Sequence, residues 1–225
     1  MEKQKFKQEI DNWLQEVYEK CNEFGEILNK DYYPFQSSKE SLQKGVDLLI
    51  IGANPHGENS FNQNKEIDGL FNCGSDGYNA FITYPKWNIS VPVIEIFSTP
   101  NLRKVLENVV ILNAVYFNTN EVKDLSHKTA VDFCIKKTKE FIDILSPKVI
   151  LILGFDVPKW LKIPRNNEKN GAVFEDETKK NALVYQTHIS NIPTYIIHHP
   201  SRNPRFNNNA NLAKKREFFE EIFEK

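Results

Sequence analysis

The segment Val46-Asp-Leu-Leu-Ile-Ile-Gly-Ala-Asn-Pro-His-Gly57 gives the strongest indication of the fold class, because an apolar run leads straight into a turn of small and polar residues. The apolar run, Val46–Ile51, is nearly continuous rather than alternating. Such runs are typical of strands that are buried on both faces, as in parallel sheets covered by helices. The glycine and proline that follow indicate a tight turn at the end of this strand.

Three more runs of the same kind follow along the chain: Val109–Leu112, Val149–Leu153 and Thr194–Ile197. Helical patterns separate the runs, at Leu102–Glu107, Lys128–Leu145 and Val157–Leu161. Alternating strands and helices imply right-handed βαβ units. The sequence therefore predicts an α/β fold, a three-layer α/β/α sandwich around a central, mostly parallel four-stranded sheet.

The ends of the chain are predicted to be helical. Apolar side chains recur at three- and four-residue steps over Lys3–Leu28, and Ser37–Lys44 suits a further short helix. We therefore expect residues 1–45 to form a helical extension packed on a single domain that comprises residues 1–225. A last helix is predicted over Asn211–Phe223, and the alternating run Leu183–His188 suggests a fifth strand at the sheet edge.

Two stretches are predicted to be irregular. Lys162–Lys180 is polar and contains glycine, which indicates a surface excursion. Residues 57–100 contain several glycines and show no sustained period. A long loop that leaves a strand end in a compact domain is usually functional or disordered, so this stretch is a candidate part of a site.

Composition excludes several classes of function. The 225 residues carry a formal net charge of −1, so there is no global basic field for nucleic acid, and any such binding needs a local patch. The three cysteines form no CxxC pair, which argues against a disulfide framework, an iron–sulfur cluster or a zinc site. The charged N-terminus lacks a signal-peptide pattern, and no apolar run approaches the ~18 residues of a membrane span. We expect a cytoplasmic monomer without metal or cofactor.

Polar side chains follow three of the predicted strands. Asn54 and His56 lie in the turn after the first strand, Asn113 follows the second, and His199 follows the last. Open α/β sheets bind ligands at the carboxyl ends of their strands. Each residue also has a plain structural explanation, as part of a strand-exit turn or as a cap. Because adjacent strand residues point to opposite faces, at most one of His198 and His199 faces a cleft directly.

Taken together and in this chain order, the three sites resemble the motifs of the uracil-DNA glycosylase superfamily. The resemblance rests on Gly52-Ala53-Asn54-Pro55, on Leu112-Asn113 and on His199-Pro200-Ser201. The run Val149–Gly154 followed by Val157–Leu161 is similar to the third strand and helix of that family, so the resemblance extends from Val46 to the C-terminal helix. It implies a monofunctional enzyme that flips a nucleotide out of the stack and hydrolyses its N-glycosidic bond.

The resemblance also implies roles for individual residues. Asn54 would position the attacking water, His199 would donate a hydrogen bond to the pyrimidine carbonyl, and Asn113 would recognise the base edge. The pocket would be completed by the rest of the turn and by a stacking aromatic from residues 57–100. The predicted pocket residues from the turn are Gly52, Ala53, Pro55 and His56. The candidates for the stacking aromatic are Phe61, Phe71, Tyr78 and Phe81, of which Tyr78 and Phe81 are included in the predicted site.

The sequence departs from the family pattern at three positions. Asn54 stands where the commonest uracil enzymes have Asp. The mismatch-specific branch of the superfamily also has Asn at this position. His56 replaces the glycine of that branch, so it either restricts the pocket or donates to a ligand. Asn203 replaces the apolar wedge that fills the space of the flipped base, and Arg202 or Phe206 are the substitutes within reach.

A local basic segment follows the last strand. Five cations and no Asp or Glu lie between His199 and Arg216. The segment suits contact with DNA or single-stranded nucleic acid, although charge runs are often only solvated surface. Its predicted contact residues are Ser201, Arg202, Asn203, Arg205 and Lys214. The alternative to a glycosylase is an inactive module that binds a nucleobase or nucleic acid on the same fold; another hydrolase ranks lowest, since G-x-S-x-G is absent.

Overall fold

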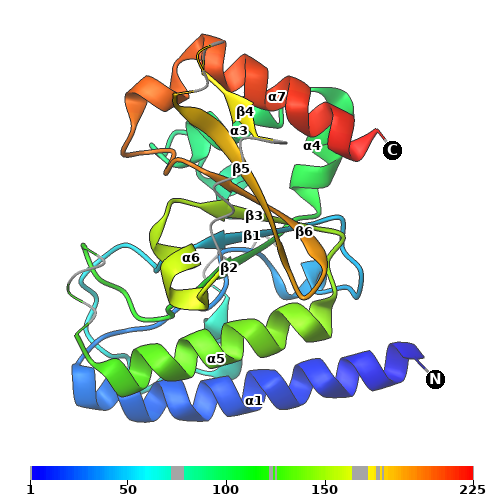
Figure 1. The fold of residues 1–225 in the computed structure, drawn as a ribbon. Coiled ribbons are helices and arrows are strands. Elements are labelled where there is room, and N and C mark those ends of the chain that lie inside the picture. The colour runs from blue at the N-terminus through cyan, green and yellow to red at the C-terminus, as the bar shows by residue number, and fades with distance from the viewer. Residues whose placement is uncertain are drawn as a thin grey trace.

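The computed structural model of the protein describes residues 2–71, 79–121, 124, 126–163, 172–175, 178 and 180–224. These residues form an α/β fold with a six-stranded mixed sheet in the order β2-β1-β3-β6-β5-β4 (Figure 1). The strands are β1 (Leu48–Gly52), β2 (Val110–Asn113), β3 (Val149–Leu153), β4 (Val173–Phe174), β5 (Ala182–Ile189) and β6 (Ile192–Ile197).

The four apolar runs of the sequence all form strands, and the α/β class is confirmed. Strands β2, β1, β3 and β6 pair in parallel, as their continuous burial predicts. The expected number of strands was too low, because two antiparallel strands extend the sheet beyond β6. A turn with positive φ at Ser190 and Asn191 joins β5 to β6. The two-residue β4 then pairs with β5, so β5 is not the edge strand that its alternation suggested.

Helices cover both faces of the sheet (Figure 1). Leu49 and Ile51 of β1 pack on the face covered by α1, α5 and α6, whereas Leu48 and Ile50 pack on the face covered by α3, α4 and α7. The helices are α1 (Glu2–Leu28), α2 (Ala80–Thr83), α3 (Ser90–Ile96), α4 (Pro100–Glu107), α5 (Lys128–Leu145), α6 (Asp156–Leu161) and α7 (Asn209–Phe223). None of the helices in the described part of the chain is long and apolar enough to cross a membrane.

Helix α1 lies along α5 and contributes to the core of the sheet (Figure 1). Trp13 of α1 is buried among the rings of Phe35, Tyr116 and Phe141, and its indole N–H donates to the Lys137 carbonyl at 3.0 Å. The free thiols of Cys21 and Cys134 meet in the same interface, where burial raises the pKa of Cys21. The N-terminal helix is therefore part of the main core.

The stretch from residue 57 to residue 100 is more regular than its composition indicates. It contains a short 3-10 helix, η2 (Ile67–Leu70), and the helices α2 and α3. The expected helix over 37–44 is reduced to one 3-10 turn, η1 (Lys39–Ser41). These elements are too short for their periodicity to stand out in the sequence.

Residues 31–36, which we call the edge segment, cover the outer edge of β2. Bridges join Tyr32 to Phe117 and Phe35 to Leu112 in antiparallel orientation. The segment is anchored by a buried ion pair in which the Lys65 ammonium lies 2.6 Å from the Asp31 carboxylate. The edge segment runs beside the end of β2, where Phe35 pairs with Leu112, so it lies next to Asn113 of the predicted site.

Candidate functional site

The parallel strands carry the predicted residues to one edge of the sheet. Gly52 at the end of β1 pairs in register with Asn113 at the end of β2. On the other side of β1, β3 ends at Leu153, which pairs with Ile197 at the end of β6. His199 follows two residues later. Neighbouring strands lie about 4.8 Å apart, so β1 and β6 are separated by two such spacings, roughly 10 Å.

The turn after β1 is fixed by backbone hydrogen bonds to the segment after β2. The amides of Ala114 and Val115 donate to the carbonyls of Gly52 and Ala53, both at 2.9 Å, and Thr119 donates to Pro55. Gly57 has a φ of 138°, a conformation that favours glycine. Within this turn Pro55 is buried and the side chain of His56 is exposed. The loop therefore has a defined shape, with His56 on its outer surface.

The side-chain amide of Asn54 is oriented by its partners. Its Nδ2 donates to Thr119 Oγ1 at 2.9 Å, to the Thr119 carbonyl at 3.3 Å and to the Pro55 carbonyl at 2.9 Å. Carbonyl oxygens only accept, so these contacts fix which end of the amide is nitrogen. Among the described residues nothing donates to Oδ1. Asn54 therefore presents a free acceptor of the kind that holds a water.

Asn118, close to this loop, has a buried and unpartnered amide. The side chain is 0% exposed, and neither Oδ1 nor Nδ2 has a hydrogen-bond partner among the described residues. A Cβ built on Gly57 would lie 3.7 Å from Asn118 Nδ2, so the amide lies against the loop. Leaving a buried polar group unpaired costs about 1–3 kcal/mol, and such groups in native structures need an explanation. The sequence pattern did not identify this residue.

Asn113 lies at the expected place but is largely enclosed. It is 4% exposed, and its Nδ2 donates to the Tyr33 carbonyl of the edge segment at 2.9 Å. Its backbone N–H donates to the Pro34 carbonyl at 2.8 Å. A Cβ on Gly52 would lie 3.3 Å from Asn113 Oδ1, so glycine leaves room for this amide. One donor of the predicted base-recognising group is thus already used by the protein.

His199 lies in the turn after β6 and packs on Gly154 after β3. A Cβ on Gly154, whose φ is 92°, would approach the His199 side chain to 3.4 Å. His199 Nδ1 accepts from the Ser201 backbone N–H at 3.3 Å and contacts its hydroxyl at 3.0 Å. With Nδ1 as acceptor, the proton of the neutral ring is on Nε2. The Ser201 hydroxyl is therefore used within the turn.

The charge state of His199 follows from its surroundings. Burial, and secondarily the positive charge of Arg202, lower its pKa from 6.5 to about 4, against the opposing influence of Asp156. The ring is therefore neutral at physiological pH and offers Nε2–H as a donor. His198 lies elsewhere: its ring stacks on Phe206 with centroids 3.7 Å apart, and its Nε2 contacts the Ala182 carbonyl.

The turn that carries His199 is held from inside the protein by Lys215 of α7. Lys215 is 0% exposed, and its ammonium donates to the Phe206 carbonyl at 2.7 Å and to Asn207 Oδ1 at 2.8 Å. Asn207 Nδ2 in turn donates to the carbonyls of His199, Pro200 and Asn203, at 3.3, 3.0 and 3.1 Å. Burial lowers the pKa of Lys215 to about 8.

Lys215 is one of the five cations counted in the basic segment, but its burial excludes it from a surface that contacts phosphate. Its spacing from Leu212 and Phe219 puts it on the apolar face of α7, a signal that its charge concealed.

The rest of the basic segment is less available than its composition indicates. Arg205 pairs with Glu175 at 3.0 Å, Lys214 donates to the Glu175 carbonyl at 2.7 Å, and Arg216 pairs with Glu95. Arg202 is exposed, and its guanidinium has no hydrogen-bond or ion-pair partner among the described residues, although its backbone N–H donates to the His199 carbonyl at 3.2 Å. Asn203 is half-buried, and its carbonyl accepts from Asn207. The free charge is therefore concentrated at Arg202.

The aromatic candidates are distributed differently from the prediction. Phe81 is 3% exposed and packs in the core on the α7 side of the sheet, so the assignment of Phe81 to the base pocket is wrong. Phe71 is half-buried and stacks on Phe35 with ring centroids 4.7 Å apart. Phe61 packs against Gly25 of α1. Tyr78 lies outside the described residues.

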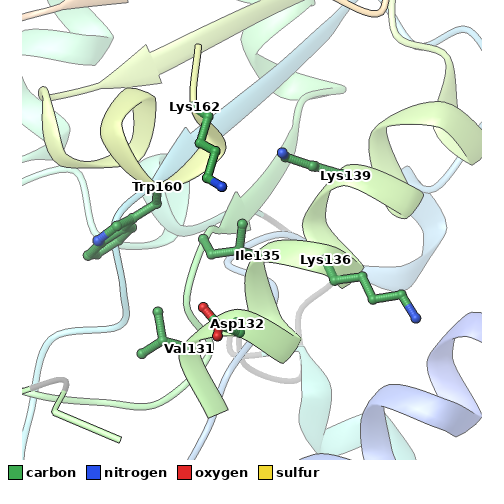
Figure 2. A pocket seen from close by; sticks show the side chains of 7 residues that line it. All are labelled: Val131, Asp132, Ile135, Lys136, Lys139, Trp160 and Lys162. Atoms are coloured by element: carbon green, nitrogen blue, oxygen red, sulfur yellow. The ribbon is translucent and has the colours of Figure 1, made fainter. Parts of the chain in front are cut away.

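Two surface cavities lie away from these strand ends. The first, about 360 Å³, lies between α5 and α6 (Figure 2), and the second, about 380 Å³, lies beside α1. Neither is lined by Asn54, Asn113 or His199. In the described part of the chain there is no group of three or more His, Cys, Asp or Glu side chains that could hold a metal ion.

No known family model matches the sequence, and no curated protein matches it significantly.

Proposed function

We propose that the protein is a DNA glycosylase that hydrolyses the N-glycosidic bond of a flipped uracil or another damaged base. The observation that carries the proposal is the neutral His199 ring with its proton on Nε2, at the same sheet edge as an oriented Asn54 amide. The order of the four parallel strands and the positions of the three motifs at their ends also support a uracil-DNA glycosylase-like sheet.

The two residues have complementary roles in the proposed reaction. When the bond between the base and C1′ breaks, its electron pair moves onto the base, and His199 Nε2–H donates to the carbonyl oxygen where that charge gathers. A neutral imidazole suits this role because its Nε2–H stabilises the charge on the carbonyl oxygen by a hydrogen bond and keeps its proton on the nitrogen. Asn54 Oδ1 accepts from a water that then bonds to C1′, and the released proton passes to solvent. An amide cannot take up that proton, so Asn54 acts by positioning the water.

Recognition of the base involves the neighbouring amides. Asn113 retains its Oδ1 for a ligand, whereas its Nδ2 is bound to the edge segment. The unpartnered amide of Asn118 supports a ligand or a bound water beside Gly57. In the proposed complex with DNA, Arg202 contacts a phosphate directly. The exposed Arg205 and Lys214 contact further phosphates once they release Glu175, which binds both of them in the free protein.

Base release from a panel of single- and double-stranded oligonucleotides tests the proposal. Each oligonucleotide carries one uracil, hypoxanthine, xanthine or mispaired thymine, and the free base is measured directly. We expect multiple turnovers on at least one substrate, and strong loss in Asn54→Ala, because the water is no longer positioned. The exposed His188→Ala serves as the control and retains activity. Absence of release from every substrate at high enzyme concentration contradicts the proposal.

A non-catalytic module that binds a nucleobase or nucleic acid is the second candidate. Asn54 in place of Asp and Asn203 in place of the apolar wedge favour it, because an amide cannot take up the proton of the attacking water and a polar side chain inserts less well into the base stack. Calorimetry with uracil and with oligonucleotides separates the two functions. Binding without turnover supports the module, and turnover beyond one equivalent excludes it.

A further inference from the structure

The cavity between α5 and α6 is lined by both apolar and basic side chains. It measures about 360 Å³, and its lining residues are Val131, Asp132, Ile135, Lys136, Lys139, Trp160 and Lys162. Ile135 lies at its floor, and the half-buried Trp160 forms one side (Figure 2). A cavity of this volume lies at the lower end of the range for small-molecule sites.

The lysines around this cavity fall into two groups. Four lysines of α5 and α6 have carboxylate partners: Lys128 with Asp132, Lys136 with Glu140, Lys137 with Glu16 and Glu140, and Lys159 with Asp156. Lys139 and Lys162 have no such partner among the described residues, and both are exposed. The unpaired positive charge of these two helices is therefore confined to the cavity.

The two unpaired lysines converge. Figure 2 shows Lys139, from α5, and Lys162, at the end of α6, extending toward each other above Ile135, while Lys136 extends away. Lys162 has a φ of 55°, and its backbone N–H caps α6 by donating to the Lys159 carbonyl, so its Cα–Cβ direction is fixed by the helix end. Two ammonium groups that face one another without a counter-charge are stabilised by an anion between them. Asp132 does not supply that charge, because its carboxylate pairs with Lys128.

We propose that this cavity binds a phosphorylated aromatic ligand of mononucleotide size. The phosphate lies between Lys139 and Lys162, and the planar ring packs on the Trp160 indole, since stacking on an aromatic side chain contributes about 1–3 kcal/mol per base. A free nucleoside monophosphate and one nucleotide of a single strand both carry such a phosphate and planar ring. This site is separate from the strand ends and does not depend on the proposed glycosylase function.

Binding is measured by calorimetry, and the Trp160 indole N–H signal in ¹H–¹⁵N spectra locates the ligand. The probes are uridine monophosphate, uridine, inorganic phosphate and a short oligodeoxythymidine without a terminal phosphate. We expect uridine monophosphate to bind at least about tenfold more tightly than uridine or phosphate alone and to shift the Trp160 signal. Tighter binding of the oligonucleotide identifies a single strand as the source, and tighter binding of the monophosphate identifies a free nucleotide.

Matched double variants test the role of the lysines. Lys139→Gln with Lys162→Gln is expected to weaken binding at least about tenfold, because it removes both phosphate contacts. Lys20→Gln with Lys148→Gln removes the same formal charge from exposed, ion-paired positions that do not line the cavity, and is expected to change binding less than about twofold. Equal effects of the two double variants would overturn the proposal. It is also overturned if phosphate binds as tightly as the nucleotide, or if the Trp160 signal does not move.

Discussion

Replacement of Lys65 by methionine is expected to lower the free energy of unfolding by about 3–5 kcal/mol, because it leaves the Asp31 carboxylate buried without its counter-charge. Both side chains are almost fully buried, at 4% and 5% exposure. The ammonium also donates to the Tyr32 carbonyl and lies 3.7 Å from the centre of the Tyr33 ring. Burial lowers the pKa of Lys65, whereas the hydrogen bond and charge of Asp31 oppose that change.

Urea denaturation of three variants checks this expectation. Lys39→Met, which breaks the exposed ion pair with Asp68, is expected to cost only about 0–1 kcal/mol. The double variant Asp31→Asn with Lys65→Met should recover part of the loss, because no unpaired charge remains. If Lys65→Met is no more destabilising than Lys39→Met, the ion pair does not anchor the edge segment, and the support that this segment gives to Asn113 must come from elsewhere.

The second large effect is expected at His199. His199→Ala should lower the rate constant for base release by about 10²–10³, the usual cost of removing one donor to a developing oxyanion. The measurement is single-turnover release from the best substrate of the panel, with the exposed His188→Ala as the histidine control. Equal rates for His199→Ala and the wild type would mean that the ring does not contact the leaving base.

The pH profile gives an independent check on the same residue. Because the pKa of His199 is lowered to about 4, kcat/KM should not depend on His199 down to about pH 5 and should fall below that as the ring is protonated. The lowered pKa of His199 also makes the free energy of unfolding depend on pH. Between pH 6.5 and pH 4 the unfolded chain binds a proton that the folded chain does not, so this residue makes the protein less stable as pH falls. His199→Ala should lose that contribution, as measured by urea denaturation at pH 7 and pH 5.

The sheet was predictable because parallel strands buried on both faces leave a local signature. Each of the four continuous apolar runs is a strand, and α5 begins and ends at the predicted residues. The helix has clear local ends: His127 Nδ1 accepts from the Ala130 N–H, and Ser146 takes a φ of 46°. By contrast, β4 has two residues and the edge segment is held by long-range backbone bonds, so neither leaves a periodic pattern.

The site was predictable in position more than in detail. Residues that follow parallel strands must lie at one edge of the sheet, so Asn54, Asn113 and His199 lie along the same edge, with β1 and β6 two strand spacings apart. Which polar atoms are already bonded depends on residues far away in the chain. Asn113 Nδ2 is bound by Tyr33, which lies 80 positions earlier, and Arg205 is paired with Glu175, 30 positions earlier. The interior position of Lys215 likewise depends on the packing of α7.

Titration of ¹⁵N-labelled protein with free uracil, or with the base released best from the panel, tests most directly whether one ligand contacts both catalytic candidates. We predict that the Asn54 side-chain amide and the His199 Nε2–H signals shift together and give the same dissociation constant. Shifts at only one of the two residues, or no shift at either at saturating base, would contradict a shared site.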